Sequence, residues 1–180
     1  MTLLNCENLI HQYSKWLGRL AAILLILLLL NVFYDVVMRY LFNDVSIGMQ
    51  ELEWHLYASI FLLGVPYALT HNGHVRVDVI YERQSVKARA WIDIFGVLIF
   101  LLPFCLLVGY YSLNFVADSF SMSEQSGDPG GLPYRWLIKS VIPFAFLSMA
   151  LCGLGFMLHA INTIRGLHHD NDEPTPETLS

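Results

Sequence analysis

Two pairs of ionisable side chains, each spaced four residues apart in an apolar context, are candidates for chemistry, because this spacing puts both members on one face of a helix. The first pair, Asp35 and Arg39, can form a local ion pair that lowers the cost of placing either charge near hydrocarbon. The second pair, Glu51 and His55, has side chains that bind metals, but a metal site in a protein needs at least three such ligands. No second pair lies nearby in the sequence, so we expect no metal site.

The 7 histidines raise another possibility, a haem-carrying membrane anchor of a respiratory enzyme. Haem b usually takes two histidines at matching depth on facing helices. We expect His55 near the outer end of one helix and His159 near the inner end of another, too far apart to share one iron. His71 and His74 could reach the level of His159, but only at the membrane interface. The haem anchor therefore stays the alternative function, and we expect no cofactor.

The elements that carry these residues are apolar enough to lie in a membrane. Of the 180 residues 56% are hydrophobic, and the mean hydropathy of +0.52 is too high for an ordinary soluble domain. A helix needs about 20 apolar residues to cross about 30 Å of hydrocarbon. The sequence therefore predicts an all-α integral membrane protein with short interfacial segments and four transmembrane helices, at residues 20–38, 52–70, 92–116 and 137–161.

The rest of the chain completes one membrane domain, expected over residues 1–166. Residues 167–180 are rich in proline and acidic residues and are predicted to be a disordered cytoplasmic tail. The net charge of −5 is spread over loops and this tail, a pattern that does not suggest nucleic-acid binding.

Basic residues predict the orientation of the four spans, because they are enriched in cytoplasmic loops. An even number of spans places both termini and the loop after the second span on one side of the membrane. That side carries seven of the basic residues and the other side three, so we expect both termini in the cytoplasm. The seven are Lys15, Arg19, Arg76, Arg83, Lys87, Arg89 and Arg165, and the three are Arg39, Arg135 and Lys139.

Three helical segments carry further signals. The Leu-rich run at residues 24–30 is almost featureless, which suggests a lipid-facing surface. Pro103 lies in the middle of the third span, where proline usually kinks a helix. Small side chains repeat every three or four residues in the fourth span, a pattern that lets another helix approach closely. These small residues are Ala145, Ser148, Cys152 and Gly155.

Several short motifs together resemble one family, the small membrane subunit of tripartite ATP-independent periplasmic (TRAP) transporters, of the DctQ type. Each motif alone would be weak, but together they cover most of the chain. They are Arg39 and Phe42 after the first span, Glu51 and Glu53 at the start of the second, Gly64, the HVRVD motif at residues 74–78, Tyr81-Glu82-Arg83, and DPGGLPYRWLIK at residues 128–139.

The resemblance implies an accessory subunit, not an enzyme, in the bacterial inner membrane. In this family a large membrane subunit of the DctM type carries substrate and sodium in an elevator movement, while a soluble periplasmic substrate-binding protein captures the substrate. The small subunit is expected to brace the large one, to help dock the binding protein and to contact phospholipid. An organic acid is the expected substrate class, with 2-oxo acids, dicarboxylates, sugar acids and aromatic carboxylates all open.

The resemblance also implies which residues matter for structure or for partner contacts. We expect Glu51 to have a charge partner, either a basic residue of a partner subunit or Arg39, the nearest candidate because it ends the preceding helix on the same side of the membrane. We see no inverted repeat and no interrupted helix pair, so we do not expect this chain to transport substrate alone. The candidate structural or interface residues are Arg39, Glu51, Glu53, His74, Arg76, Asp78, Asp128, Gly130 and Arg135.

Overall fold

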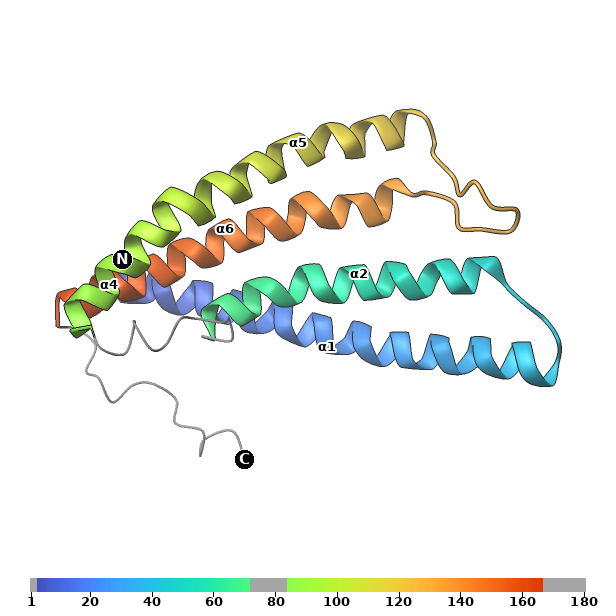
Figure 1. The fold of residues 1–180 in the computed structure, drawn as a ribbon, viewed down its shortest axis with the longest axis horizontal. Coiled ribbons are helices and arrows are strands. Elements are labelled where there is room, and N and C mark those ends of the chain that lie inside the picture. The colour runs from blue at the N-terminus through green and yellow to red at the C-terminus, as the bar shows by residue number, and fades with distance from the viewer. Residues whose placement is uncertain (1–2, 72–83, 167–180) are drawn as a thin grey trace.

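A computed structural model describes residues 3–71 and 84–166, and within these ranges every regular element is a helix. The predicted all-α fold is therefore confirmed for this part of the chain, and the predicted tail lies outside it. The elements shown in Figure 1 are α1 (Leu3–Leu41), α2 (Ile47–Thr70), α4 (Val86–Gly96), a π-helical turn η1 (Val97–Leu101), α5 (Leu102–Ser121) and α6 (Trp136–Ile164).

Three of the described helical segments are long and apolar enough to cross a membrane. They are Leu3–Leu41, Val86–Ser121, in which α4, η1 and α5 follow one another without a break, and Trp136–Ile164. The remaining long helix, α2, has 24 residues and therefore a length of about 36 Å. Its first turns carry Glu51, Glu53 and His55, so it has no apolar stretch as long as those of the three candidates. The span count of four and the orientation thus stay predictions.

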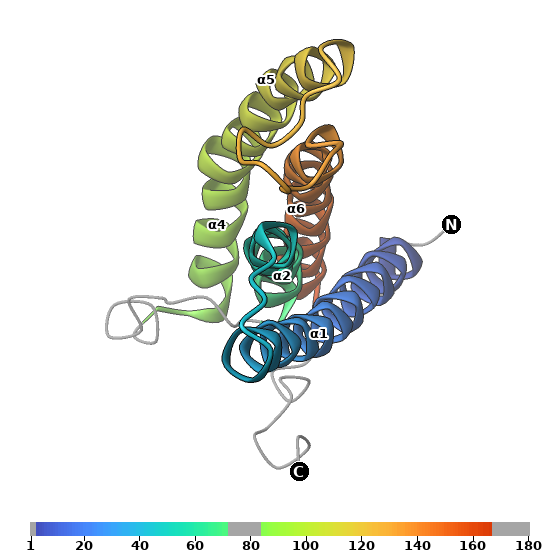
Figure 2. The same ribbon diagram turned by 90° about the vertical axis from the view of Figure 1, so that its right-hand side faces the viewer.

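Helix α6 is the centre of the arrangement, because α1, α2, α4 and α5 all pack against it. Helix α1 also pairs with α2 along its length, so that α5, α6, α2 and α1 follow one another across the molecule (Figures 1 and 2). The turn at residues 42–46 and the α5–α6 loop at residues 122–135 lie at one end, which we call the loop end. The beginnings of α1 and α4 and the end of α6 lie at the opposite end (Figure 1).

The stripe of small side chains on α6 forms the contact with α1, as predicted. Ser148 and Cys152 are 4% and 0% exposed, and the Ser148 Oγ lies 2.7 Å from the Tyr13 hydroxyl. At Gly155 an added Cβ would lie 2.5 Å from Cγ2 of Ile10. Helix α1 therefore approaches α6 as closely as backbone and small side chains allow, which is how membrane helices gain packing energy.

The helix that contains Pro103 departs from regular α geometry in the turn that ends two residues before it. Residues Val97–Leu101 form a π-helical turn, in which the N–H of Leu102 donates to the carbonyl of Val97, five residues earlier. Proline has no N–H and its ring clashes with the carbonyl four residues earlier, so a wider turn relieves both problems. The widened turn packs against Gly153 of α6, where an added Cβ would lie 2.5 Å from Cδ2 of Leu101. The helical run from α4 to α5 bends along its length (Figure 1).

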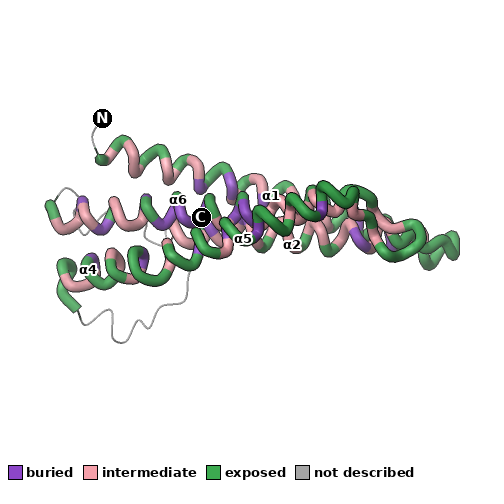
Figure 3. Tube along the Cα trace, turned by 90° about the horizontal axis from the view of Figure 1, so that it is seen from above, coloured by how far each residue is buried: buried purple, intermediate pink, exposed green. Residues whose placement is uncertain are grey.

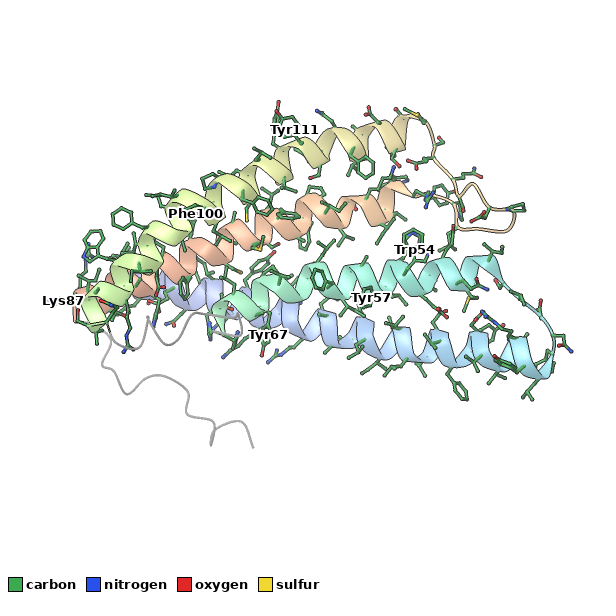
Figure 4. All side chains as sticks on the ribbon, viewed as in Figure 1. Trp54, Tyr57, Tyr67, Lys87, Phe100 and Tyr111 are labelled. Carbon is green, nitrogen blue, oxygen red and sulfur yellow. The ribbon has the colours of Figure 1, made fainter. Side chains whose placement is uncertain are left out.

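Large apolar side chains cover the outside of the molecule. Figure 3 shows exposed residues along the outward side of every helix and buried residues concentrated where helices meet. In the Leu-rich run of α1, Ile26, Leu29 and Leu30 are 58%, 62% and 60% exposed, which agrees with a lipid-facing surface. Tyr111 of α5 is 65% exposed and points away from α6 (Figure 4). So much exposed apolar area fits hydrocarbon or a protein partner better than water.

Candidate functional site

Helix α2 begins at the loop end with a side-chain cap. Ser46 has an extended backbone, and its Oγ accepts a hydrogen bond from the N–H of Met49 at 3.3 Å, as expected for an N-cap serine. The Met49 carbonyl in turn accepts a hydrogen bond of 2.9 Å from Nδ2 of Asn31, a buried side chain of α1. The first turn of α2 is therefore fixed both by its own cap and by the neighbouring helix.

One turn into α2, Glu51 turns its carboxylate toward the α5–α6 loop. The side chain is 6% exposed. Its Oε1 accepts a hydrogen bond from the Ser126 hydroxyl, and its Oε2 accepts one from the N–H of Leu132 at 2.6 Å. We call this set of contacts between Glu51, Ser126 and Leu132 the Glu51 latch. It joins the start of α2 to a loop that lies more than 70 residues later in the chain.

The loop closes on itself between the two residues that the latch holds. The N–H of Ser126 donates to the Leu132 carbonyl at 3.2 Å, and the N–H of Gly131 donates to the Asp128 carbonyl at 3.0 Å. Residues 127–130, which we call the loop tip, are all exposed, and Asp128 is their only charged residue. The latch therefore holds both ends of a short segment whose tip faces outward.

Glycine is required at two positions of this loop. Gly130 has a φ of +85°, a conformation that side chains with a Cβ adopt only under strain. At Gly131 an added Cβ would collide with the Ser126 side chain and would lie 2.9 Å from Oε2 of Glu51. The Gly130 carbonyl also lies close to α2, 3.2 Å from a Cβ placed on Gly48. The loop rests directly on the first turn of α2.

Basic side chains secure the return of the loop into α6. The Arg135 guanidinium lies over the Trp54 ring, 5.7 Å from its centroid, and Figure 4 shows Trp54 on the side of α2 that faces α6 and the loop. Lys139 forms an ion pair with Glu124, and its Nζ lies 3.9 Å from the centroid of the Phe115 ring. The loop is thus held to α2, α5 and α6.

Hydrogen bonding favours the charged form of both carboxylates that hold the loop. The Ser126 hydroxyl, followed by the Leu132 N–H, lowers the pKa of Glu51, which lies before the predicted span at residues 52–70. The hydrogen bond from Lys139 is the main cause that lowers the pKa of Glu124. Both groups therefore stay ionised at pH values below their usual range.

The expected pair between Arg39 and Glu51 is not formed. Arg39 pairs with Asp35, four residues earlier on α1, which confirms the local ion pair that the spacing predicts. Asp35 is 4% exposed, so this contact balances a buried charge. The oxygens of Glu51 already accept the two hydrogen bonds from the loop. The expected pair was chosen because Arg39 and Glu51 lie on the same side of the membrane. That reasoning could not show that the loop folds over α2 and provides the hydrogen-bond donors for Glu51.

The other predicted interface residues are distributed unevenly. Asp128, Gly130 and Arg135 lie in the loop that Glu51 holds, so the structure gathers four of the predicted residues at one place. Glu53 is partly exposed, and within the described residues its side chain forms no hydrogen bond or ion pair. His74, Arg76 and Asp78 lie outside the described residues.

Four residues of this site were not found from the sequence. Ser126 and Leu132 complete the latch, Trp54 receives Arg135, and Glu124 pairs with Lys139. The motif at residues 128–139 drew attention to the loop, but not to the residue that holds it. Asn31 offered a signal that was not used, because a lone amide in an otherwise apolar helix usually contacts another helix.

The four histidines of the described residues are divided between the two ends of the molecule. His55 lies near the beginning of α2, at the loop end, whereas His159 lies near the end of α6, at the opposite end. His159 Nδ1 is 2.7 Å from Glu7, and the His11 and His71 rings stack with centroids 4.8 Å apart. Among the described residues no group of three or more His, Cys, Asp or Glu side chains could hold a metal ion. The haem-anchor alternative is not supported.

Comparison with known proteins agrees with the resemblance seen in the motifs. A family model described as the DctQ component of tripartite ATP-independent periplasmic transporters matches residues 27–163. A TRAP transporter small permease protein of Haemophilus influenzae is 28% identical over 153 residues, which cover 84% of this chain and 95% of the relative. The ectoine TRAP transporter small permease protein TeaB of Halomonas elongata is 26% identical over 155 residues, 84% of this chain and 75% of the relative.

No solved structure matches the chain at a comparable level of significance. The family match extends from the Leu-rich part of α1 almost to the end of α6 and includes both the Glu51 latch and the loop tip. The chain therefore belongs to the DctQ component family of the tripartite ATP-independent periplasmic transporters.

Proposed function

We propose that this TRAP transporter small permease subunit braces a large DctM-type membrane subunit and helps to dock a periplasmic substrate-binding protein during sodium-driven uptake. The observation that carries the proposal is the contrast between the two kinds of surface. The helices expose large apolar side chains along their length, whereas the loop end presents a polar loop held rigidly by Glu51. The first surface suits a membrane partner and the second a soluble one.

Contacts between the helices support a bracing role. The Tyr13 hydroxyl bonds to Ser148 on α6, and Ser14 bonds to Thr70 on α2, so polar side chains of α1 tie three helices together. In an elevator mechanism a scaffold stays fixed in the bilayer while the transport domain slides. A helix bundle joined in this way can extend such a scaffold without contacting substrate.

We place the subunit in the bacterial inner membrane with four spans, and the distribution of basic residues then supports its orientation. Both termini would then lie in the cytoplasm and the loop end in the periplasm, where a soluble binding protein could reach it. The 24 residues of α2 are enough to cross the hydrocarbon, since about 20 are needed. Its polar first turns contact Asn31 and the α5–α6 loop, and these contacts would lower the free-energy cost of placing the turns in the membrane.

The substrate class would be set by the other two subunits. We propose an organic acid, the class that the family resemblance implies. The Halomonas elongata relative is named for ectoine, so a related small subunit works in a system for that solute. Ligand screening of the partner binding protein would identify the substrate of this system.

Reconstitution tests the accessory role. Proteoliposomes would contain this chain alone, the large subunit alone, or both, each with an inward sodium gradient and the loaded binding protein. We expect uptake only when both membrane subunits are present, and loss of uptake when potassium replaces sodium. Uptake by this chain alone, or full uptake by the large subunit without it, would contradict the proposal.

A further inference from the structure

We propose that Glu51 is a positioning residue for docking, which holds the loop tip at residues 127–130 in the conformation that the binding protein contacts. This inference rests on the proposed function, in which the binding protein docks at the loop end. Glu51 is 6% exposed and both of its oxygens accept hydrogen bonds from the loop, so it acts on the tip and does not touch the partner.

The latch holds the tip at both ends. Ser126 immediately precedes the tip, and Leu132 follows it after Gly131. A single carboxylate accepts hydrogen bonds from both residues, and the Ser126 N–H closes the same segment by donating to the Leu132 carbonyl at 3.2 Å. Fixing both ends of so short a segment removes most of its conformational freedom before any partner arrives.

Helix α2 sets where the tip lies relative to the rest of the molecule. Glu51 stands one turn inside α2, and that turn is held by the Ser46 cap and by Asn31 of α1. A functional loop that is held by a rigid helix is placed more accurately than one held only by its own chain ends. Through Glu51 the bundle formed by α1 and α2 therefore determines the position of a loop that belongs to α5 and α6.

The tip itself suits a soluble protein partner. Gly127, Asp128, Pro129 and Gly130 are all exposed and include no large apolar side chain, unlike the outward sides of the helices. Glycines let another protein approach the backbone closely, and binding residues are often carried on loops that a rigid scaffold positions. A tip that is already ordered loses less entropy on docking than a mobile one, which raises affinity.

Two substitutions at position 51 separate the latch from the charge. Glu51→Ala removes both acceptors and should release the tip. In Glu51→Gln the amide oxygen can accept from the Leu132 N–H while the amide NH₂ donates to the Ser126 Oγ, so the latch can form without the charge. Asp118→Asn is the control variant, because it removes a negative charge from the exposed end of α5, and the Asp118 side chain forms no hydrogen bond within the described residues.

The main measurement is sodium-driven uptake by the reconstituted complex of both membrane subunits, as the concentration of loaded binding protein is varied. We expect Glu51→Ala to raise the half-saturating concentration about tenfold, because hydrogen bonds to a charged group are lost, with the maximal rate unchanged. Glu51→Gln and Asp118→Asn should stay close to the original protein. A purely structural defect would lower the maximal rate instead.

A second measurement follows the tip directly. Nitroxide labels at Gly127→Cys and Asp44→Cys, both exposed positions of the loop end, report the distance between the tip and the turn before α2. Of the three native cysteines only Cys6 is partly exposed, so it would be replaced by serine to prevent labelling there. Cys105 and Cys152 are buried and would be kept. Pulsed electron paramagnetic resonance should give a narrow distance distribution for the original protein and for Glu51→Gln, and a broad one for Glu51→Ala.

The outcomes separate this inference from the function on which it rests. A broad distribution with unchanged half-saturation in Glu51→Ala would overturn the inference and leave the accessory function intact. A narrow distribution in Glu51→Ala would also overturn it, because Glu51 would not hold the tip. Uptake that never depends on this chain would refute the accessory function itself. If Glu51→Ala does not assemble, Ser126→Ala, which removes one donor, should show the same changes at smaller size.

Discussion

Glu51 in the second turn of α2 accepts a hydrogen bond from Ser126, a residue 75 positions later in the chain, and its carboxylate is almost completely buried where the two meet. This contact joins the α1–α2 half of the molecule to the α5–α6 half at the loop end.

A double-mutant cycle should couple Glu51 to Ser126 and not to Arg39. The combination of Glu51→Ala and Ser126→Ala should destabilise the protein less than the sum of the single losses, because both remove the same hydrogen bond. Glu51→Ala and Arg39→Ala should be additive, since Arg39 pairs with Asp35. Thermal unfolding in detergent measures both cycles. Strong coupling between positions 39 and 51 would restore the pair expected from the sequence.

Acid should reduce the stability that the two carboxylates at the loop end contribute. The pKa values of Glu51 and Glu124 are lowered in the folded protein, so each group binds its proton more weakly when folded than when unfolded. Their stabilising contribution is complete above the ordinary glutamate value of about 4.5 and is lost as the pH falls through the lower folded values. The melting temperature should therefore decrease as the pH is lowered below about 4.5. In the double variant Glu51→Gln, Glu124→Gln the decrease in melting temperature at acid pH should be smaller. An unchanged dependence of the melting temperature on pH would show that these two carboxylates do not cause the decrease.

The contact between α1 and α6 should be sensitive to side-chain size at Gly155. A Cβ there would lie 2.5 Å from Cγ2 and 3.1 Å from Cβ of Ile10, and a β-branched side chain cannot rotate its Cβ away. Gly155→Ala should cost about 1–3 kcal/mol through overpacking. Gly64→Ala is the matched control, because no atom lies within 4 Å of its added Cβ, and it should be neutral or slightly stabilising. Equal effects of the two variants would show that the close approach does not occur.

Cysteine labelling should place the loop end in the periplasm. A membrane-impermeant maleimide should label Gly127→Cys in intact cells, since an added side chain there meets open space, and should label Ser85→Cys only after the membrane is opened. Ser85 caps the beginning of α4, at the opposite end of the molecule. The reverse labelling pattern would mean that the basic residues had indicated the wrong orientation.

The apolar runs located the helices but not their ends. The predicted first span at residues 20–38 is the second half of a helix that begins at Leu3 and ends at Leu41, and the predicted third span at residues 92–116 lies within a helical run from Val86 to Ser121. Hydropathy marks the part of a helix that can lie in hydrocarbon. The additional turns of α1 carry Tyr13 and Ser14, whose polar groups contact α6 and α2, so their helical structure depends on tertiary packing.

Local signals in the sequence predicted local features well. Pro103 indicated an irregular helix, and the small residues of α6 indicated a close helix contact, although not that α1 makes it. The Glu51 latch could not be predicted in this way. Its donors come from a loop far along the chain, and one of them is a backbone N–H that any residue except proline could supply.

The central position of α6 has a consequence for biosynthesis. Helices α1 and α2 pair extensively with each other, so this hairpin can form as soon as both have been made. Helices α4 and α5 find their main packing surface on α6, which the ribosome makes after them. Before α6 is synthesised, the π-helical turn before Pro103 cannot pack against Gly153. Glu51 likewise has no hydrogen-bond donors until the loop that follows α5 has been made. Until α6 has been made, α4 and α5 therefore lack the main surface against which they pack.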